Sequence, residues 1–289
     1  MMHDESGESF YFNRCAVCES VFLTNPVAEG DLGRYYTSAY LPYRGEAAWG
    51  RHAAWVRRDD NRLNAKRVKM VRPHLPSDHK DAAVLDIGCG KPDFLAKLHA
   101  TTGAHAVGID FTAAQWEDPK YRGLELLEGD WRTMPLERRF DAITAWHYLE
   151  HDYDLAATER ACHELLKPGG VLIAEVPLYE GLLQRWQQEH WQGWHSPRHL
   201  TLFSVRSWAH AFPEDRWELV EHRTFGTMSA FTLWWLGHHE KRQRAWSGSM
   251  APHFWGLVFW KVLLSPLFLL ERLLPFGVQT VILQKRPHE

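Results

Sequence analysis

The fold is decided by the stretch Val84-Leu85-Asp86-Ile87-Gly88-Cys89-Gly90. Its first four residues are apolar apart from one carboxylate, which predicts a buried strand, and the glycines that follow predict a tight turn. Beyond the turn, Phe94, Leu95 and Leu98 recur with a helical period. Glycines at a strand-to-helix corner let backbone N–H groups approach a ligand closely, and a helix N-terminus favours electron-rich groups. The stretch therefore indicates a βα unit with a ligand at its corner.

Acidic residues end the next two predicted strands. The apolar run 105–109 (HAVGI) is followed by Asp110, and the run 124–129 (LELLEG) is followed by Asp130. An acid at the end of the second strand of a nucleotide-binding βαβ unit can accept hydrogen bonds from both ribose hydroxyls. An NAD-binding fold uses an acid at the same place, but its GxGxxG fingerprint needs a third glycine near Asp93, and this chain has none there.

Two further strands are predicted at residues 140–145 (FDAITA) and 171–176 (VLIAEV). In chain order, the motifs VLDIGCG, GID, EGD, FDAITAWHYLEH and LLKPGGVLIAEVP resemble those of the class I S-adenosylmethionine-dependent methyltransferases. The resemblance is close over residues 82–177 and looser over most of the chain. It implies an α/β fold with a Rossmann-like seven-stranded sheet, mostly parallel with an antiparallel last strand, and S-adenosylmethionine as the cofactor.

The resemblance also implies which residues bind the cofactor. It assigns the acid of the first strand and the glycine turn to the methionine part, and the acid after the second strand with its neighbour to the ribose. It assigns the acid and tryptophan after the third strand to the adenine, and the tryptophan that ends the fourth strand to the sulfonium end. In chain order, these residues are Asp86, Gly88, Cys89, Gly90, Asp110, Phe111, Asp130, Trp131 and Trp146. One departure is Pro92, where many family members have a glycine; proline fits a first helical turn but removes one backbone donor.

The segment after the fourth strand is one of two candidates for catalysis. If a helix begins near Tyr148, His147 and His151 are four residues apart and share one face, with Glu150 beside them. Histidine titrates near neutral pH, so either ring suits a general base. The resemblance implies that His147, like Trp146, faces the sulfonium end of the cofactor. Two alternatives stay open. Quinone-ring O-methyltransferases, which this region resembles, carry a comparable acid-and-histidine motif linked to a metal, and the cluster could also serve only local capping and packing.

The second candidate segment is residues 191–200 (WQGWHSPRHL), which follow the fifth strand. Open α/β sheets bind ligands beyond the carboxyl ends of their strands. His195, Arg198 and His199 place three cationic or protonatable side chains within five residues. The resemblance puts a similar segment near the substrate. The structural alternative is that Arg198 pairs with a carboxylate and fixes the loop.

Bulk composition narrows the class of protein. The chain has 289 residues, 45% of them hydrophobic, which suits one domain with embellishments or one domain and a small second lobe. Lys plus Arg (33) nearly balances Asp plus Glu (36), so no overall field favours nucleic acid as a partner. The basic pairs 57–58 and 66–67 are interpreted as solvated helix faces. The polar, acidic N-terminus is unlike a secretory leader, so we expect a cytoplasmic protein.

Residues 1–60 contain two features before the core. Cys15 and Cys18 form one CxxC pair, half of the cysteine ribbon that several related enzymes carry, and zinc would need further ligands, for which His3 is a candidate. A hairpin with reduced thiols is the favoured interpretation. Next comes an aromatic segment that either folds over the cofactor as a lid or fills a helix–sheet interface. Its rings are Tyr35, Tyr36, Tyr40, Tyr43, Trp49, His52 and Trp55.

An unusual insertion precedes the last strand. Strands predicted at 217–225 and 279–285 would form the antiparallel pair, yet about fifty residues separate them, far more than a hairpin needs. The insertion includes Trp246 and the apolar run 254–274, which is interrupted by a proline and three charges, so we do not expect it to span a membrane. It forms either a helical subdomain that covers the substrate or a surface that contacts a membrane, with basic residues at 241–244 facing headgroups.

We therefore expect four regions: a cysteine hairpin and lid (1–60), a methyltransferase core (61–225), a helical aromatic insertion (226–276) and the last strand of the core (277–289). The expected activity is methyl transfer from S-adenosylmethionine to a small or medium organic molecule, with a hydroxyl oxygen as the favoured acceptor. The alternatives are a non-catalytic partner protein that keeps the fold and a methyltransferase acting on a lipid-type substrate at a membrane surface. The substrate and the oligomeric state are not predicted.

Overall fold

The computed structural model describes residues 7–36, 44–242 and 248–287. His3, Tyr40, Tyr43 and Trp246 lie outside the described residues. The chain forms two compact units, each built from three separate segments. Unit 1 takes residues 1–60, 177–206 and 224–279, and unit 2 takes residues 61–176, 207–223 and 280–289.

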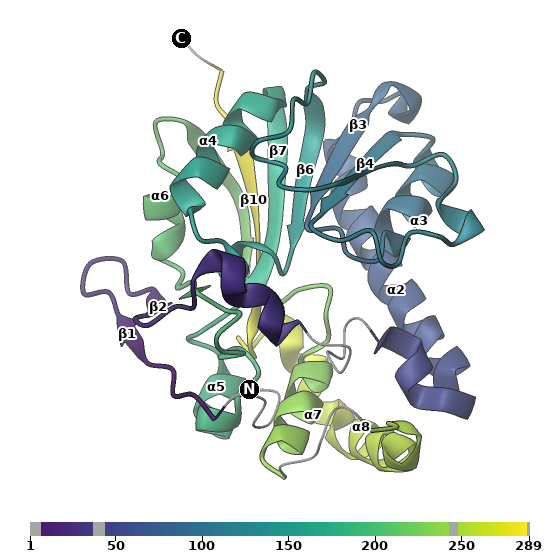
Figure 1. The fold of residues 1–289 in the computed structure, drawn as a ribbon, viewed down its shortest axis with the longest axis vertical. Coiled ribbons are helices and arrows are strands. Elements are labelled where there is room, and N and C mark those ends of the chain that lie inside the picture. The colour runs from purple at the N-terminus through teal and green to yellow at the C-terminus, as the bar shows by residue number, and fades with distance from the viewer. Residues whose placement is uncertain (1–6, 37–43, 243–247, 288–289) are drawn as a thin grey trace. The chain divides into compact units, whose positions relative to one another are not determined.

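The elements are labelled in chain order in Figure 1. The strands are β1 Phe12–Arg14, β2 Val21–Leu23, β3 Ala83–Ile87, β4 His105–Asp110, β5 Glu125–Glu128, β6 Phe140–Trp146, β7 Leu166–Pro177, β8 Thr201–Leu202, β9 Trp217–Arg223 and β10 Val278–Lys285. The α-helices are α2 Ala53–Val71, α3 Asp93–Thr102, α4 Leu155–Leu165, α5 Leu182–Gln187, α6 Ser207–Ala211, α7 Ala230–Glu240 and α8 Phe254–Phe268. Three short 3-10 helices matter below: η2 Gly45–His52, η6 Leu149–His151 and η9 Leu269–Arg272.

Unit 2 is organised around a seven-stranded sheet with the order β5-β4-β3-β6-β7-β10-β9 (Figure 1). Neighbours from β5 to β7 pair in parallel, and β10 pairs antiparallel with β9. The predicted fold class, a mostly parallel sheet with an antiparallel last strand, is confirmed. The strand order reverses between β4-β3 and β6, so the carboxyl ends of β3, β4 and β6 meet at the switch point where open α/β sheets bind ligands.

Close packing of α3 on the sheet fixes the glycine turn. The predicted apolar face of α3 is buried, with Phe94 2% exposed and Leu95 and Leu98 fully covered. Gly108 in β4 permits this approach, because a Cβ there would lie 2.7 Å from Leu95 and 2.9 Å from the Cys89 sulfur. Any larger residue would push α3 off the sheet and move the turn that begins it.

Unit 1 contains a second, three-stranded sheet of order β1-β2-β8. Cys15 and Cys18 lie in the turn between β1 and β2, where backbone hydrogen bonds from Cys18 and Val17 lower the pKa of the Cys15 thiol. The hairpin is therefore present, but it is not isolated: β8, which follows the 191–200 segment, pairs with β2. Two cysteines supply half of the ligands of a tetrahedral zinc site, and the favoured interpretation, a hairpin with reduced thiols, stays a prediction.

Aromatic residues make up half of the buried cluster in unit 1. Trp234 and Trp235 of α7 and Phe254 and Phe268 of α8 are buried in one cluster. The aromatic segment of residues 49–55 joins this cluster, because the rings of Trp49, His52 and Trp55 all contact Phe254. These three rings therefore pack on the helices of the insertion. This packing differs from both sequence interpretations, a lid over the cofactor and the filling of a helix–sheet interface.

The segment Ala251–Arg272 is long and apolar enough to cross a bilayer, judged by length and composition alone. It has 22 residues with a mean hydropathy of 1.5, and only 11% of its most apolar stretch is buried. No other described helix meets the same criteria. A segment with this composition and so little cover differs from an ordinary core helix.

Candidate functional site

The glycine turn after β3 is shaped by two residues with positive φ. Gly88 has φ +66°, and a Cβ there would overlap the ring of Tyr148. Gly90 has φ +49°, and no described atom lies within 4 Å of the position that its Cβ would take. A residue with a Cβ is strained at positive φ, so both positions favour glycine. Tyr148 therefore closes one side of the turn, while the space beside Gly90 is left open.

Asp110 at the end of β4 is tied to this turn. Its carboxylate accepts a hydrogen bond from the Gly90 N–H at 2.8 Å and another from the Thr112 N–H at 3.3 Å. Burial raises the pKa of Asp110, and these backbone hydrogen bonds oppose the rise. The acid predicted to hold the ribose thus also positions the turn. Phe111, its predicted neighbour in the site, is 60% exposed.

Asp86 lies one strand away, almost completely buried within β3. The Thr144 hydroxyl of β6 donates a hydrogen bond to its carboxylate at 2.6 Å. Burial raises the pKa of Asp86 to about 7, against the opposing effects of Thr144 and of the positive charge on Arg67. An ionised carboxylate in such a place is costly unless a cation is near, so the site favours a positively charged ligand.

Arg67 of α2 supplies a cation that the sequence analysis did not assign to the site. Its guanidinium carbon lies 4.8 Å from the centre of the Trp146 ring. The interpretation of residues 66–67 as a solvated face is therefore wrong for Arg67, which is partly buried, and right for the exposed Lys66. Trp146 is 7% exposed, and its buried Nε1 has no hydrogen-bond partner among the described residues. A buried N–H donor with no partner in the described protein can donate a hydrogen bond to an acceptor atom of a bound ligand.

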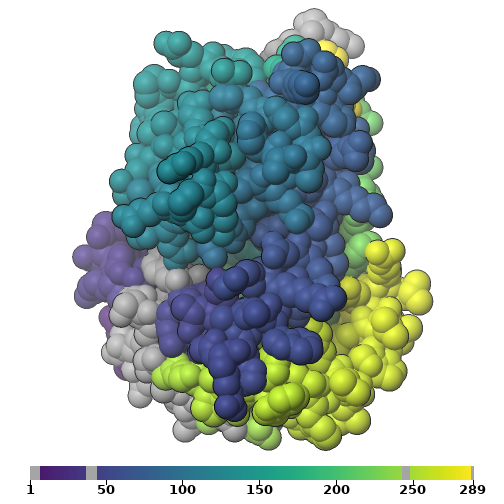
Figure 2. Space-filling model, turned by 90° about the vertical axis from the view of Figure 1, so that its right-hand side faces the viewer, coloured from purple at the N-terminus to yellow at the C-terminus, as the bar shows by residue number. Residues whose placement is uncertain are grey.

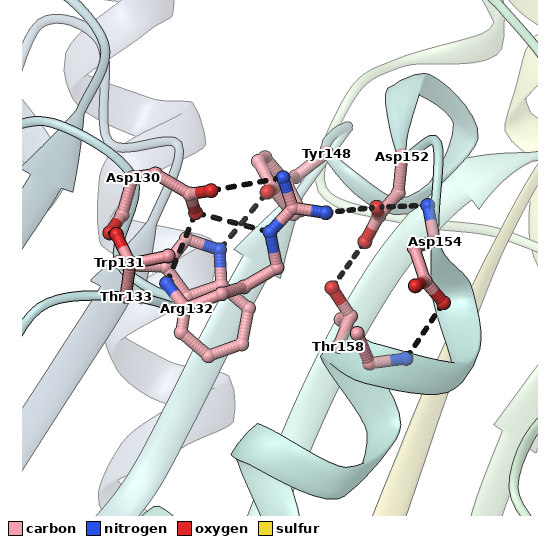
Figure 3. Close-up of polar contacts among 9 residues, drawn as sticks. Asp130, Trp131, Arg132, Thr133, Tyr148, Asp152, Asp154 and Thr158 are labelled. Carbon is pink, nitrogen blue, oxygen red and sulfur yellow. Dashed lines mark hydrogen bonds and ion pairs between the residues drawn. The ribbon is translucent and has the colours of Figure 1, made fainter.

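Asp130 after β5 forms a charged network that Figure 3 shows. The Arg132 guanidinium donates hydrogen bonds to both carboxylate oxygens of Asp130, at 3.0 and 3.1 Å, and to Asp152 at 3.3 Å. Burial tends to raise the pKa of Asp130, but the hydrogen bonds and charge of Arg132 outweigh it and lower that pKa. A carboxylate has about four lone-pair sites, so Asp130 keeps capacity for the predicted adenine contact. The sequence analysis missed Arg132, although it lies two residues after the acid.

The same network joins the loop after β5 to the loop after β6. The Trp131 Nε1 donates to the Tyr148 hydroxyl at 2.9 Å, so the tyrosine beside the glycine turn is also anchored to the residue after Asp130 (Figure 3). Asp152 accepts from the Asp154 N–H at 2.9 Å and from the Thr158 hydroxyl of α4. The loops after β5 and β6 are therefore held in fixed positions by polar contacts that are at least partly buried.

His147 lies between two buried carboxylates. Its Nδ1 is 3.3 Å from Glu150 and its Nε2 is 3.1 Å from Glu175, and both glutamate side chains are fully covered. Its backbone has φ +55°, a conformation that costs free energy for a non-glycine residue, and its N–H donates to the Glu175 carbonyl at 2.7 Å. Burial alone would lower the pKa of His147, but the hydrogen bonds and charges of the two glutamates raise it to about 9.

The condition under which His147 and His151 would share a face, an α-helix that begins near Tyr148, is not met. Only the single 3-10 turn η6, Leu149–His151, follows β6, and a 3-10 turn advances by three residues rather than 3.6. His147 and His151 therefore do not share a helix face. Glu175 lies in the apolar strand motif of residues 171–176. A charged residue inside an apolar strand is the sequence signal that identifies it.

In unit 1, the segment 191–200 brings His195, Arg198 and His199 together. Arg198 is 1% exposed; it lies 3.2 Å from the His195 Nε2, and it donates to the Tyr35 carbonyl. The His199 Nδ1 is 2.7 Å from the Gly193 carbonyl oxygen. Arg198 thus fixes this loop to the aromatic segment before α2. The structural alternative expected Arg198 to fix the loop through a carboxylate, and here a backbone carbonyl accepts instead. Whether any of the three contacts a substrate remains a prediction.

Together these features fit S-adenosylmethionine. The space beside Gly90, the buried Trp146 donor, the buried acid of β3, the acid that ends β4 and the acid that follows β5 offer room and partners for its amino acid, ribose and adenine parts. A Rossmann-like sheet with such groups at its switch point defines the class I methyltransferases. This class is confirmed by comparison: the chain belongs to the methyltransferase-domain family, whose profile matches residues 56–222.

The sequence relatives are methyltransferases. The chain is 36% identical over 122 residues to the ubiquinone biosynthesis O-methyltransferase of Xylella fastidiosa, covering 39% of this chain and 48% of that one. It is 34% identical over 131 residues to the enzyme of the same name from Stutzerimonas stutzeri, covering 41% and 55%. The chain thus spans about half the length of the curated relatives that it matches.

Solved structures share the fold. A methyltransferase from Haloferax volcanii, determined in complex with the Trm112 methyltransferase activator, has a TM-score of 0.52 at 18% identity and covers 84% of this chain and 99% of its own. Geranyl diphosphate C-methyltransferase from Streptomyces coelicolor has a TM-score of 0.51 at 14% identity and covers 91% of each chain. At such identities the likeness concerns the fold alone.

Proposed function

We propose that this enzyme transfers the methyl group of S-adenosylmethionine to a hydroxyl oxygen of a small or medium organic molecule. When bound, the cofactor supplies a methyl group activated by a sulfonium. Methyl transfer is an in-line displacement, so the protein contributes mainly by orienting the reactants, and this can supply several kcal/mol of the barrier. The O-methyltransferases among the sequence relatives support oxygen as the acceptor.

His151 is the residue that we assign to remove the hydroxyl proton. The observation that carries this choice is the environment of His147, whose two ring nitrogens both face carboxylates, at 3.3 and 3.1 Å. A histidine fixed in this way is poorly suited to accept a proton from a substrate. We therefore assign His147 the role of a positioning residue that sets the loop from β6 to η6, and so places His151.

Cofactor binding is tested first, by isothermal titration of the purified enzyme with S-adenosylhomocysteine. Asp110→Ala removes the carboxylate that accepts from the Gly90 N–H, and we expect it to weaken binding by about tenfold to a hundredfold, since a hydrogen bond to a charged group contributes about 1.5–3 kcal/mol. Asp118→Ala, at an exposed acid whose carboxylate contacts Lys120, is the matched control and should bind like the wild type. Equal binding by all three proteins would contradict the assigned site.

The acceptor atom and the base are tested by incubating the enzyme with methyl-labelled cofactor and a panel of alkylated catechols, anilines and indoles. Labelled methyl ethers alone would support oxygen transfer. His151→Gln should then lower turnover at neutral pH by about a hundredfold, the usual scale of general-base catalysis, and an alkaline pH should restore part of it. N- or C-methyl products would overturn the proposal while leaving cofactor binding intact.

A further inference from the structure

The insertion before the last strand exposes one continuous apolar face. Seven large apolar side chains of α8 and η9 are 41–79% exposed. With 100° between successive residues of a helix, they fall within an arc of about 120°, so they form a single stripe. We call this the α8 stripe: Trp255, Phe259, Val262, Leu263, Leu269, Leu270 and Leu273.

The opposite face of α8 is attached to unit 1. Phe254 and Phe268 are buried in the aromatic cluster, and Phe254 stacks on His52 with the ring centres 3.9 Å apart. Lys261 is turned the same way and pairs with Asp59 at 2.7 Å. Figure 2 shows the yellow-green surface of α8 beside the dark blue surface of residues 45–60. Because one face is fixed to the protein, only the α8 stripe is available to a partner.

The charges around the α8 stripe select the partner. No acidic or basic residue belongs to the stripe, and the one acid of the segment, Glu271, accepts a hydrogen bond from the Ala230 N–H of α7. Residues 241–274 contain five basic residues and one acidic residue, in a chain whose net charge is −3. Lys261 is paired with Asp59, and Lys241, Arg242 and Arg272 are exposed basic residues of the described part of this segment. An apolar face in a locally basic segment complements a bilayer with anionic headgroups.

We infer that the α8 stripe docks this enzyme on an anionic lipid surface, with α8 lying in the plane of the interface. An in-plane position follows from the packed face, since Lys261 and the aromatic cluster hold the helix along unit 1. Large aromatic and aliphatic residues on one side are typical of helices that enter the boundary between headgroups and acyl chains. A second copy of the chain fits less well, because a two-fold contact would oppose the same basic segments.

The test is flotation of the purified full chain with lipid vesicles. One set contains phosphatidylcholine alone and the other contains phosphatidylcholine mixed with phosphatidylglycerol. We expect the wild type to float with the anionic set, less at high salt, and little with the neutral set. The double variant V262E/L263E adds two negative charges to the α8 stripe and should lower the floating fraction by about tenfold or more.

The matched control is L219E/V220E, the same two changes at exposed residues of β9 in unit 2. Leu219 and Val220 are 51% and 47% exposed, close to the 54% of Leu263. This control should float like the wild type, and both variants should keep the wild-type melting temperature. The inference is overturned if the wild type does not float, if V262E/L263E floats normally, or if both variants lose flotation equally. A wild-type dimer that V262E/L263E converts to a monomer, without flotation, would instead assign the stripe to self-association.

Discussion

The two units depart in opposite directions from the usual distribution of side chains. Unit 2 buries charge: Asp86, Glu150 and Glu175 are each 0–3% exposed near the ends of its strands. Unit 1 exposes apolar surface, and its α8 stripe is covered by nothing that belongs to the described chain. Buried charges and exposed apolar stripes both cost free energy in an isolated protein. Each therefore marks a place where something other than the chain completes the structure.

The chemistry of the missing partner differs between the two places. A buried carboxylate whose pKa is raised favours a small cationic ligand that enters the site, which suits a sulfonium cofactor. An exposed apolar stripe favours an extended surface, which suits a lipid layer. The contrast between the two units would be wrong if either the buried charge of unit 2 or the exposed α8 stripe of unit 1 had no effect on stability or binding.

The largest expected effect concerns the buried histidine between its glutamates. Glu175→Gln keeps the shape of the side chain but leaves the His147 imidazolium with one charged partner, so we expect a loss of about 3–5 kcal/mol in the free energy of unfolding near pH 7. The matched change is Glu125→Gln at the exposed His105–Glu125 pair, where we expect less than about 1 kcal/mol. Urea unfolding measures both.

The pH dependence provides the control for this prediction. The pKa of His147 is raised to about 9 in the folded state, from an unfolded value near 6.5, so its stabilising effect is complete below about pH 6.5 and is lost as the pH rises through 9. The difference between wild type and Glu175→Gln should therefore shrink at alkaline pH. A constant difference would show that lost packing, rather than charge, explains the variant.

A second pair of changes compares the two apolar helices directly. Leu98→Ala in α3 empties a fully buried position and should cost about 2–5 kcal/mol. Leu263→Ala in α8 removes a side chain that is 54% exposed and should change the free energy of unfolding by less than about 0.5 kcal/mol. Thermal and urea unfolding in the absence of lipid measure both. Similar losses in the two variants would mean that the α8 stripe is covered in solution.

The smallest expected effect runs in the stabilising direction. Because the pKa of Asp86 is raised to about 7 in the folded state, the folded chain binds more protons than the unfolded chain between about pH 4 and 7, and stability falls as the pH rises through this window. Asp86→Asn removes that cost, so at pH 8 it should be more stable than the wild type by about 2 kcal/mol, with no gain at pH 4. The same variant should bind S-adenosylhomocysteine more weakly. A uniform gain at every pH would contradict the assigned ionisation.

The core of unit 2 could be predicted from the sequence because its signals are local. A buried strand followed by a glycine turn predicts β3 and its corner within six residues, and the acids after β4 and β5 occupy the positions that their strands dictate. The sheet order then follows from the resemblance, because parallel strands joined by helices admit few arrangements. The strands at 217–223 and 278–285 were also predicted, despite the long insertion between them.

The contacts within the site could not be predicted in the same way. Arg67, Tyr148 and Glu175 act through partners 17 to 79 residues away in the chain, and no periodic pattern encodes such pairs. No α-helix follows β6 directly, because His147 leaves the strand with a positive φ. The backbone carbonyl of Glu175 on a neighbouring strand accepts from the His147 N–H and stabilises this conformation. The packing of the aromatic core of unit 1 was not predicted for a related reason, since its rings come from three separate segments.

The place of β10 in the sheet affects how the protein is made. β10 lies between β7 and β9, yet it is synthesised after both, about fifty residues behind β9. On the ribosome, β9 therefore has no neighbour until α7 and α8 have emerged, and the nascent chain presents an open sheet edge and an uncovered apolar helix at the same time. Such intermediates aggregate readily. A nearby lipid surface or a chaperone that shields α8 during these seconds would raise the yield of folded enzyme, independently of any effect on its finished form.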